Sequence, residues 1–424
     1  METENTCDVA IEITPGRLAG RVRVPLSKSL LHRALIMSML AGDLSLTELG
    51  DHVLSEDIAA TLDCLKKLMS TRESDRETRL FCNESGSTLR FMIPLVGALG
   101  RTVVFEGAGR LPERPLLEYA SIFEGKGVRL EFPDNGMYLP LRMSGQLQPG
   151  HFEVPGNISS QYISGLLMAL SILKGNSDIL VTSKLESEPY VEMTRDVMDD
   201  FGVLTDKVGE SYSVTGGQKI SRTEPYLAEP DYSHAAFWFV ANYLGNGIDI
   251  LDLPARSLQG DSEIVSLLED IREFSETVSV ENGNTHFTVS ASQVPDLIPV
   301  LSIACAATDC VVQIINGQRL RLKECDRLEA TCEMLERLGV NIERKESGMT
   351  IFGRDSEDGQ PIFNSCEINS YGDHRLVMAA AVAATRAEGP VRITDCHAIN
   401  KSYPEFFRDF RRLGGKADEL DVGE

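Results

Sequence analysis

The stretches MTRDVMDDFGV (residues 193–203) and LEATCEMLERLGV (residues 328–340) share the pattern that decides the fold. In each stretch apolar side chains recur at helical spacing, as at Met193, Val197 and Met198, and a glycine then precedes a valine. Glycine just past the last turn is the usual helix stop, because it adopts the left-handed backbone conformation without strain. Both stretches therefore predict an amphipathic helix that ends at glycine and leads into a strand.

This pattern repeats at a regular interval. Gly127 and Gly202 are 75 residues apart, and so are Gly339 and Gly414. A weaker copy occurs once more in each half of the chain. The spacing predicts an α/β protein of six helix-plus-strand units, three in each half, although a helix–glycine–strand sequence also occurs in α/β proteins that are not duplicated. Two prolines within residues 224–231 indicate the boundary between the halves.

Composition and charge exclude several function classes. With 424 residues and 42% hydrophobic content, the chain is expected to form two or three domains. The net charge of −23 argues against binding to nucleic acid or to an anionic membrane surface. The longest apolar runs, such as residues 166–173, are much shorter than a membrane span. A small anionic substrate is still compatible with this charge, provided that basic side chains gather at one site.

The cysteines and the N-terminus indicate a reducing compartment. Nine cysteines are present and none forms a CxxC pair, so we expect neither a disulfide framework nor a structural zinc site. Residues 1–10 are acidic and lack the features of a signal or transit peptide. We therefore expect a cytoplasmic protein.

Five predicted helix starts carry polar and cationic residues. A helix N-terminus offers unpaired N–H groups and a partial positive charge, so phosphates and carboxylates bind there. Each motif alone is better explained as a helix cap with solvated cations, but their repetition in an acidic protein predicts anion sites in both halves. Two further cations, Arg114 and Lys401, lie in predicted loops. The five starts are Lys28-Ser29 with Arg33, Gly86 with Arg90, Ser159-Ser160-Gln161, Lys323-Glu324 with Arg327, and Asp373 with Arg375.

Helical spacing gives two of these motifs a more specific expectation. Ser29 and Arg33 are four residues apart and share a helix face, so we expect them to converge with Lys28 on one anion. Lys323 and Arg327 are also four apart, and the same rule places them on one face with Glu324 nearby.

In this order the motifs resemble the enolpyruvyl transferase family, in particular its EPSP synthase branch. The resemblance runs from about residue 16 to residue 407 and includes SKS (27–29), SGST (85–88), ERP (113–115), SSQ (159–161), SEPY (187–190), PD (295–296), KECDR (323–327) and GDHR (372–375). It implies two similar domains joined by a two-strand hinge, each built from three βαβαββ repeats in an inverse α/β barrel. One domain would comprise residues 26–228, and the other residues 1–25 plus 229–424.

The resemblance also implies a reaction. The family transfers the enolpyruvyl group of phosphoenolpyruvate to the 5-hydroxyl of shikimate 3-phosphate and releases phosphate, through a tetrahedral intermediate. This step belongs to the shikimate pathway of aromatic amino acid biosynthesis. It needs no cofactor and no metal, and the family is usually monomeric. Its helix N-termini face a cleft that closes between the domains.

Site residues follow position by position from the resemblance. For catalysis, our hypothesis is that Asp296 is the base, that Glu324 is the proton shuttle, and that Lys28 and Lys401 stabilise developing charge. Shikimate 3-phosphate would contact Ser29, Arg33, Ser159, Ser160, Ser187, Tyr190, Asp296, Arg319 and Lys323. Phosphoenolpyruvate would contact Lys28, Gly86, Arg114, Gln161, Arg327, Arg375 and Lys401.

Two alternatives remain open at this point. A related enolpyruvyl transferase acts on UDP-N-acetylglucosamine, but the SSQ and SEPY motifs favour the shikimate branch. The second alternative is a binding protein that has lost catalysis. Its only support is Leu26, which stands where the family usually has glycine. Leucine excludes a left-handed backbone and would narrow the approach to Lys28. Cys325 is expected to be a packing residue and not a nucleophile.

Overall fold

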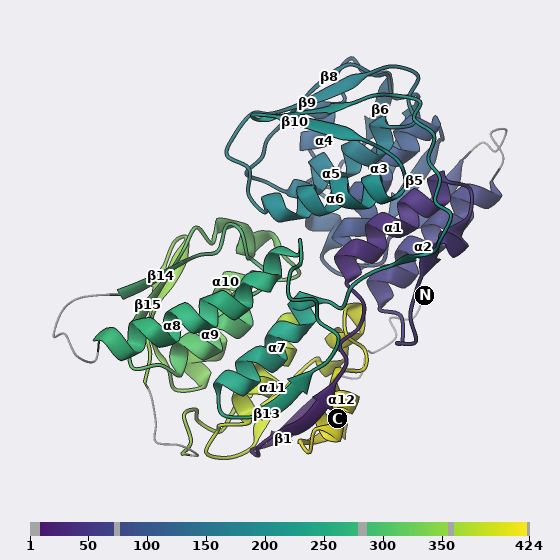
Figure 1. Ribbon diagram of the computed structural model, residues 1–424. Coiled ribbons are helices and arrows are strands. Elements are labelled where there is room, and N and C mark those ends of the chain that lie inside the picture. The colour runs from purple at the N-terminus through teal and green to yellow at the C-terminus, as the bar shows by residue number, and fades with distance from the viewer. Residues whose placement is uncertain (1–8, 72–76, 279–285, 355–359, 422–424) are drawn as a thin grey trace. The chain divides into compact units, whose positions relative to one another are not determined.

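The computed structural model describes residues 9–71, 77–278, 286–354 and 360–421. The chain folds into two compact units. We call residues 26–229 the N-terminal unit, and residues 1–25 with 230–424 the C-terminal unit. The expected boundary lay one residue earlier, at residues 228 and 229. Helices and strands are labelled in Figure 1.

Each unit is built around three buried inner helices. These segments are apolar on nearly all sides, and a helix of that kind is stable only inside a core. Every residue of α9 and of α11 is buried. The inner helices of the N-terminal unit are α1 (Lys28–Leu40), α3 (Gly86–Leu99) and α5 (Ser160–Leu170), and those of the C-terminal unit are α7 (Tyr232–Tyr243), α9 (Ile298–Ala306) and α11 (His374–Ala384).

Each inner helix is followed in sequence by an outer helix, most of which are amphipathic. In α6 the buried face includes Met193, Val197 and Met198, as the sequence predicted. The predicted glycine stops are also confirmed, because Gly202, Gly339 and Gly414 have φ of 79°, 81° and 95°. The outer helices are α2 (Glu56–Ser70), α4 (Glu118–Ile122), α6 (Glu188–Asp200), α8 (Ile264–Val278), α10 (Arg327–Arg337) and α12 (Phe406–Arg412).

Four four-stranded sheets share one strand order. In each, a parallel pair comes first, and the third and fourth strands pair antiparallel. The N-terminal strand β1 takes part in the last sheet, which explains why residues before 26 belong to the C-terminal unit. The sheets are β4-β5-β7-β6 (Thr78–Phe81, Val103–Glu106, Leu141–Gly145, Val128–Glu131), β8-β9-β11-β10 (His151–Val154, Ser177–Val181, Ser211–Val214, Thr205–Val208), β14-β15-β17-β16 (His286–Ser290, Val311–Ile315, Gly348–Phe352, Asn341–Lys345) and β18-β19-β1-β20 (Cys366–Ile368, Val391–Ile393, Val9–Thr14, Lys416–Asp421).

Two short parallel pairs complete the repeats, namely β3 with β12 (Thr47–Glu48, Tyr226–Leu227) and β2 with β13 (Ala19–Val22, Gly247–Ile250). The six predicted helix-plus-strand units are thus confirmed. The described strands form six separate sheets and no closed barrel. Between the units the chain crosses twice. Beside these crossings Ser27 N–H donates to Glu229 O and Asp231 N–H donates to Pro25 O.

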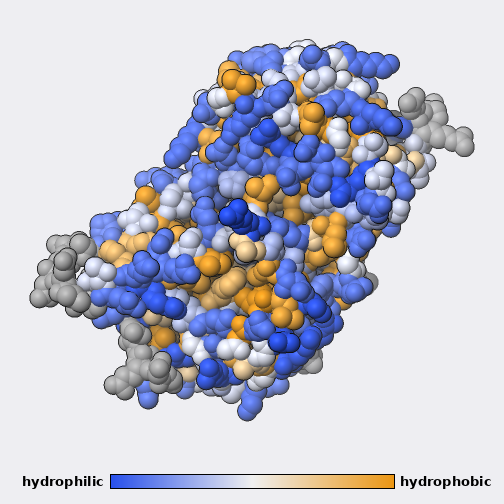
Figure 2. All heavy atoms as spheres, viewed as in Figure 1, coloured by the Kyte–Doolittle hydropathy of each residue, from blue (hydrophilic) through white to orange (hydrophobic). Residues whose placement is uncertain are grey.

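The surface view in Figure 2 shows mostly polar side chains, with apolar residues between them in smaller groups. No helix in the described part of the chain is long and apolar enough to span a membrane. The eight cysteines within the described ranges are free thiols.

Candidate active site

In the N-terminal unit the helices that carry candidate residues begin at serines. The side chains of Ser55, Ser85 and Ser159 accept backbone N–H groups from the first turns of α2, α3 and α5. Ser27 and Ser187 precede α1 and α6 without such a bond. A hydroxyl caps a helix without adding charge, so the partial positive charge of these helix ends is not neutralised by their caps.

Lys28 and Arg33 do not converge on one point, contrary to the expectation from spacing. Lys28 Nζ lies 2.7 Å from Asp57 Oδ2 at the start of α2. Arg33 is 3% exposed, and its guanidinium donates to Thr194 Oγ1 at 2.7 Å and to the Tyr190 carbonyl at 2.9 Å. Burial lowers the pKa of Arg33 to about 10. Arg33 therefore links α1 to the first turns of α6, which begins within the SEPY motif.

Gly86 and Arg114 are in close contact. A β-carbon at Gly86 would lie 2.8 Å from Arg114 Nη1, so a side chain at this position would displace the guanidinium. The loop that carries Arg114 is fixed at Pro115, whose carbonyl accepts Tyr162 Oη at 3.0 Å and Arg90 Nη2 at 3.3 Å. The loop thereby holds the Arg114 guanidinium against the first residue of α3.

Gln161 lies between two of these elements. Its Oε1 accepts Arg90 Nη1 at 3.0 Å, and its Nε2 donates to Ser87 Oγ at 2.9 Å. The first turns of α3 and α5 are thus joined through one amide. Of the hydroxyls predicted to bind phosphate, Ser160 is buried and Ser187 has a left-handed backbone with φ of 57°. A non-glycine residue in that region carries strain, which proteins concentrate at functional sites.

In the C-terminal unit, Arg327 is the centre of a buried ion network. Its guanidinium is 1% exposed and contacts three carboxylates. Nε lies 2.8 Å from Asp373 Oδ2, Nη1 lies 2.7 Å from Asp296 Oδ1, and Nη2 lies 2.5 Å from Glu324 Oε2. This fork joins the starts of α9, α10 and α11.

Asp296 receives two more cations. Lys323 Nζ lies 3.2 Å from its Oδ1, and Arg375 Nη2 lies 3.1 Å from its Oδ2. Burial alone would raise the pKa of Asp296, but Arg375, Lys323 and Arg327 together hold it well below its usual range. The carboxylate is therefore ionised and, with three cations around it, is a weak base.

The placement of Lys323 corrects one prediction. Helix α10 begins at Arg327 with Asp326 as its cap, so Lys323 precedes the helix and shares no helical face with Arg327. The two cations meet because both reach Asp296. Burial is the main cause that lowers the pKa of Lys323, to about 8, and the charge of Asp296 opposes it.

The remaining candidates lie around this network. Lys401 Nζ donates to the Gly372 carbonyl at 2.8 Å, next to the cap of α11. Arg319 lies half-buried in the 3-10 helix Gln318–Leu322. Cys325 is buried, its Sγ lies 3.6 Å from Asp373 Oδ2, and burial raises its thiol pKa, which fits a packing residue.

The chain matches the family model described as EPSP synthase (3-phosphoshikimate 1-carboxyvinyltransferase) over residues 13–410. The chain belongs to the EPSP synthase family. It is 37% identical to the 3-phosphoshikimate 1-carboxyvinyltransferase of Clostridium novyi, with 98% of this chain and 99% of the relative covered. It is 38% identical to that of Clostridioides difficile, with 98% and 100% covered.

Solved structures agree on the fold. The EPSP synthase of Acinetobacter baumannii superposes with a TM-score of 0.75 at 22% identity, covering 97% of this chain and all of that one. At this identity the likeness bears on the fold alone.

Sequence reasoning missed several partners of the candidate residues of this EPSP synthase family member. Asp57 pairs with Lys28, and Thr194 with Arg33, from helices that are distant in sequence. The motif at Asp373 predicts a helix cap, and in the structure this aspartate caps α11 and also binds Arg327. No local signal could have found these pairings, because the partners lie 29, 161 and 46 residues apart.

Leu26, the departure from the usual family glycine, is accommodated without backbone strain. It is absent from the positive-φ residues, and it packs on the core of the N-terminal unit. Its side chain lies against Gly50, where an added β-carbon would be 3.0 Å from Leu26 Cδ1. The leucine is thus part of a local packing pair.

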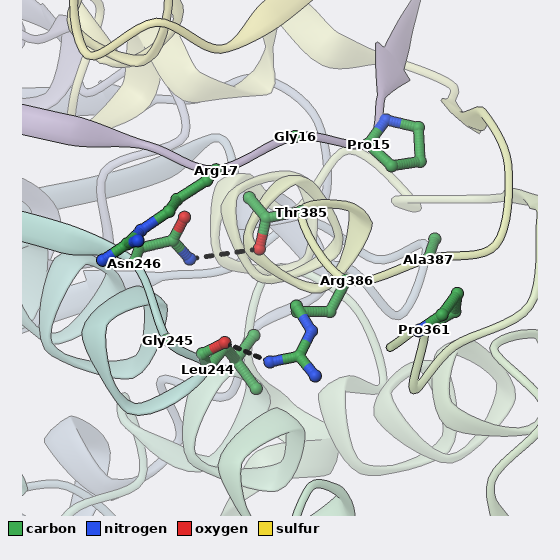
Figure 3. Close-up of a pocket in the computed structure, with 10 residues that line it drawn as sticks. All are labelled: Pro15, Gly16, Arg17, Leu244, Gly245, Asn246, Pro361, Thr385, Arg386 and Ala387. Atoms are coloured by element: carbon green, nitrogen blue, oxygen red, sulfur yellow. Dashed lines mark hydrogen bonds between the residues drawn. The ribbon is translucent and has the colours of Figure 1, made fainter. Parts of the chain in front are cut away.

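A cavity of about 570 Å³ lies at the other ends of α7 and α11, among residues that include Arg17, Leu244, Asn246 and Arg386 (Figure 3). Arg386 Nη1 donates to the Leu244 carbonyl at 2.6 Å, and Asn246 Nδ2 donates to Thr385 Oγ1 at 3.3 Å. Arg386 thus satisfies a carbonyl at the C-terminal end of α7, and Asn246 contacts the residue that ends α11. The candidate residues instead lie at the N-terminal ends.

Proposed function

We propose that this chain transfers the enolpyruvyl group of phosphoenolpyruvate to the 5-hydroxyl of shikimate 3-phosphate, with release of phosphate. The observation that carries the proposal is the EPSP synthase family match over nearly the whole chain, with relatives of that name at 37% and 38% identity. The cation-rich helix starts of both units support it, because the two substrates bring phosphate and carboxylate groups.

The residue assignments form part of the proposal. Shikimate 3-phosphate is held by hydroxyls and cations, and phosphoenolpyruvate mainly by guanidinium and ammonium groups. The first set is Ser29, Arg33, Ser159, Ser160, Ser187, Tyr190, Asp296, Arg319 and Lys323. The second set is Lys28, Gly86, Arg114, Gln161, Arg327, Arg375 and Lys401.

The proposed chemistry is addition followed by elimination. Glu324 protonates the methylene carbon of phosphoenolpyruvate, which leaves C2 electrophilic. The 5-hydroxyl attacks C2 while Asp296 accepts its proton. Glu324, now a carboxylate, takes back a methyl proton, which expels phosphate and restores the double bond. Lys28 and Lys401 stabilise the charge that develops on the phosphate oxygens.

Asp296 is a weak base before the substrates bind, and its surroundings suggest how it becomes stronger. Lys323, Arg327 and Arg375 lower its pKa in the free protein. Anionic substrate groups that bind these cations would weaken their effect on Asp296. Its pKa would then rise when both substrates are present, which is when a base is required.

The direct test is phosphate release on mixing the protein with phosphoenolpyruvate and shikimate 3-phosphate. We expect release with this acceptor and none with UDP-N-acetylglucosamine. Substrate binding by calorimetry without phosphate release would identify a binding protein that lacks catalysis, and would refute the proposal.

Glu324 is tested by the Glu324→Gln variant, which keeps an acceptor for Arg327 but cannot shuttle a proton. We expect kcat to fall by about 100-fold or more, with a small change in KM. Glu329→Gln is the matched control, since Glu329 is exposed on the first turn of the following helix. Near-normal turnover of Glu324→Gln would remove Glu324 from this role.

We further propose that the enzyme is a cytoplasmic monomer that needs no metal or cofactor and binds no nucleic acid. The net charge of −23 and the free thiols support this. Light scattering after gel filtration should give a mass near the 46.6 kDa of one chain.

A further inference from the structure

A chain of buried polar side chains joins the first two turns of three helices in the N-terminal unit, and the proposed mechanism does not use it. His32 of α1 is 1% exposed, and its Nδ1 lies 2.7 Å from Thr61 Oγ1 of α2. Thr61 Oγ1 lies in turn 2.6 Å from Thr88 Oγ1 of α3. Thr88 Oγ1 lies 2.7 Å from the Oγ of Ser85, the cap of α3. We call these four side chains the buried relay.

The hydrogen bonds of the buried relay run in one direction. Each threonine hydroxyl has a single hydrogen to donate. Thr88 donates its hydrogen to Ser85 Oγ, because the Asp57 carbonyl, at 3.4 Å, is too distant for a good hydroxyl bond. Thr61 must therefore donate to Thr88, and His32 Nδ1–H must donate to Thr61. The imidazole thus carries a proton on Nδ1.

The surroundings of the His32 ring leave it no other polar contact. Its Nε2 is buried and has no hydrogen-bond partner within the described part of the chain. The ring packs edge-on against Phe91, with ring centroids 6.4 Å apart. Burial, and after it the charges of Lys28 and Arg33, lower the pKa of His32 well below its usual value, so the ring is neutral at pH 7. Its polar contribution is therefore the bond to Thr61.

A second set of contacts joins the same helices nearer to their starts. Lys28 Nζ of α1 lies 2.7 Å from Asp57 Oδ2 of α2, and the carbonyl of Asp57 lies 3.4 Å from Thr88 Oγ1. Thr88 is two residues from Gly86, and its N–H donates to Ser85 Oγ at 3.2 Å. Lys28 and Gly86, two of the proposed phosphoenolpyruvate contacts, therefore belong to one cross-linked group of helix starts.

We propose that Thr61 and Thr88 are positioning residues, and that the buried relay from His32 to Ser85 holds the start of α3 where it binds phosphoenolpyruvate. The inference rests on the proposed function. The buried relay acts through Gly86, which would contact the substrate. Loss of a hydroxyl from its middle leaves an unpaired buried donor or acceptor on each side, so the helix start is no longer fixed.

The kinetic test replaces Thr61 with valine, which has the same shape and lacks the hydroxyl. We expect KM for phosphoenolpyruvate to rise about tenfold, as for the loss of about one buried hydrogen bond. KM for shikimate 3-phosphate should change by less than about twofold, because Arg33 is fixed separately by Thr194. Thr61→Ser keeps the hydroxyl and should restore KM for phosphoenolpyruvate.

Thr47→Val is the matched control in the same unit. Thr47 is 5% exposed, and its hydroxyl bonds to Ser38 Oγ at 2.7 Å near the C-terminal end of α1. This variant loses the same kind of bond far along the helix from its start. Its midpoint of urea unfolding should therefore fall about as much as that of Thr61→Val, while both KM values stay unchanged.

Nitrogen-15 NMR tests the direction of the buried relay without any substrate. Long-range proton–nitrogen spectra distinguish a protonated ring nitrogen from an unprotonated one. The chain has seven histidines, and the signals of His32 are those lost in His32→Asn, whose amide can still donate to Thr61. We expect a neutral ring with its proton on Nδ1 at pH 7. A proton on Nε2 alone would overturn the proposed direction.

The kinetic outcomes are distinguishable. If the unmodified enzyme releases no phosphate, the proposed function fails and the positioning role fails with it. If the unmodified enzyme is active and Thr61→Val is less stable but keeps its KM for phosphoenolpyruvate, the buried relay only stabilises the unit, and the inference alone is overturned. An equal rise in both KM values would also overturn it.

Discussion

The two units cap their helices with different chemistry. In the N-terminal unit the helix starts of α1, α2, α3, α5 and α6 are serines. In the C-terminal unit α7, α10 and α11 start at aspartates, and a further aspartate precedes α9. Serine leaves the positive helix end available to an anion, whereas aspartate neutralises it and must itself be balanced by cations. This difference fits phosphate binding in one unit and acid–base chemistry in the other.

The largest effect is expected from removing the cation that balances the carboxylates of the C-terminal unit. Arg327→Gln leaves Asp296, Glu324 and Asp373 without their shared cation, so we expect the C-terminal unit to lose about 3–5 kcal/mol of unfolding free energy in urea denaturation. Arg327→Lys should rescue little, because an ammonium group cannot form the fork. Arg344→Gln removes exposed pairs with Glu336 and Glu329 and should cost less than about 1 kcal/mol. Equal losses of unfolding free energy in Arg327→Gln and Arg344→Gln would show that the buried network stabilises the unit no more than an exposed pair does.

The next largest effect is expected when the serine cap of α5 is replaced by an aspartate. Ser159→Asp keeps a good N-cap, so the unfolding free energy should change by less than about 0.5 kcal/mol. The added charge would face the proposed phosphate, and we expect KM for shikimate 3-phosphate to rise about 100-fold in steady-state kinetics. Ser55→Asp, at the cap of α2, is the control and should leave this KM unchanged. An unaffected KM in Ser159→Asp would contradict the phosphate assignment.

A smaller effect concerns the contact between Gly86 and Arg114. The methyl group of Gly86→Ala would displace the guanidinium, so KM for phosphoenolpyruvate should rise about tenfold while KM for shikimate 3-phosphate stays constant. Gly16→Ala, whose added methyl meets nothing within 4 Å, is the control. Parallel changes in both KM values would argue against a dedicated phosphoenolpyruvate role for Arg114.

The smallest effect is a pH dependence in the C-terminal unit. The pKa of Lys323 is lowered to about 8, mainly by burial, so its positive charge is present below pH 8 and is lost as the pH rises through 8. KM for shikimate 3-phosphate should therefore rise up to about fivefold between pH 7 and pH 9, as measured in initial rates. In Lys323→Arg the rise should disappear, because arginine keeps its proton at these pH values. A rise that persists in that variant would assign the titration to another group.

The sequence predicted the repeating units correctly, because their signals are local. Apolar spacing marked the helices, and glycines such as Gly202 and Gly339 marked their ends. The helix starts at Lys28 and His374 also followed from local motifs. The prediction for Lys323 and Arg327 was wrong, because a 3-10 turn precedes α10 and the spacing rule holds only inside a helix.

Only the tertiary structure decided which charges meet. Arg327 contacts Asp296 and Asp373 at separations of 31 and 46 residues, and Lys28 contacts Asp57 at a separation of 29. Hydrophobic periodicity and glycine stops act over a few residues, so the sequence by itself determined the two-fold repeat and most of the helix starts. Buried ion pairs depend on which helix ends the packed core brings together, and no local pattern specifies that arrangement.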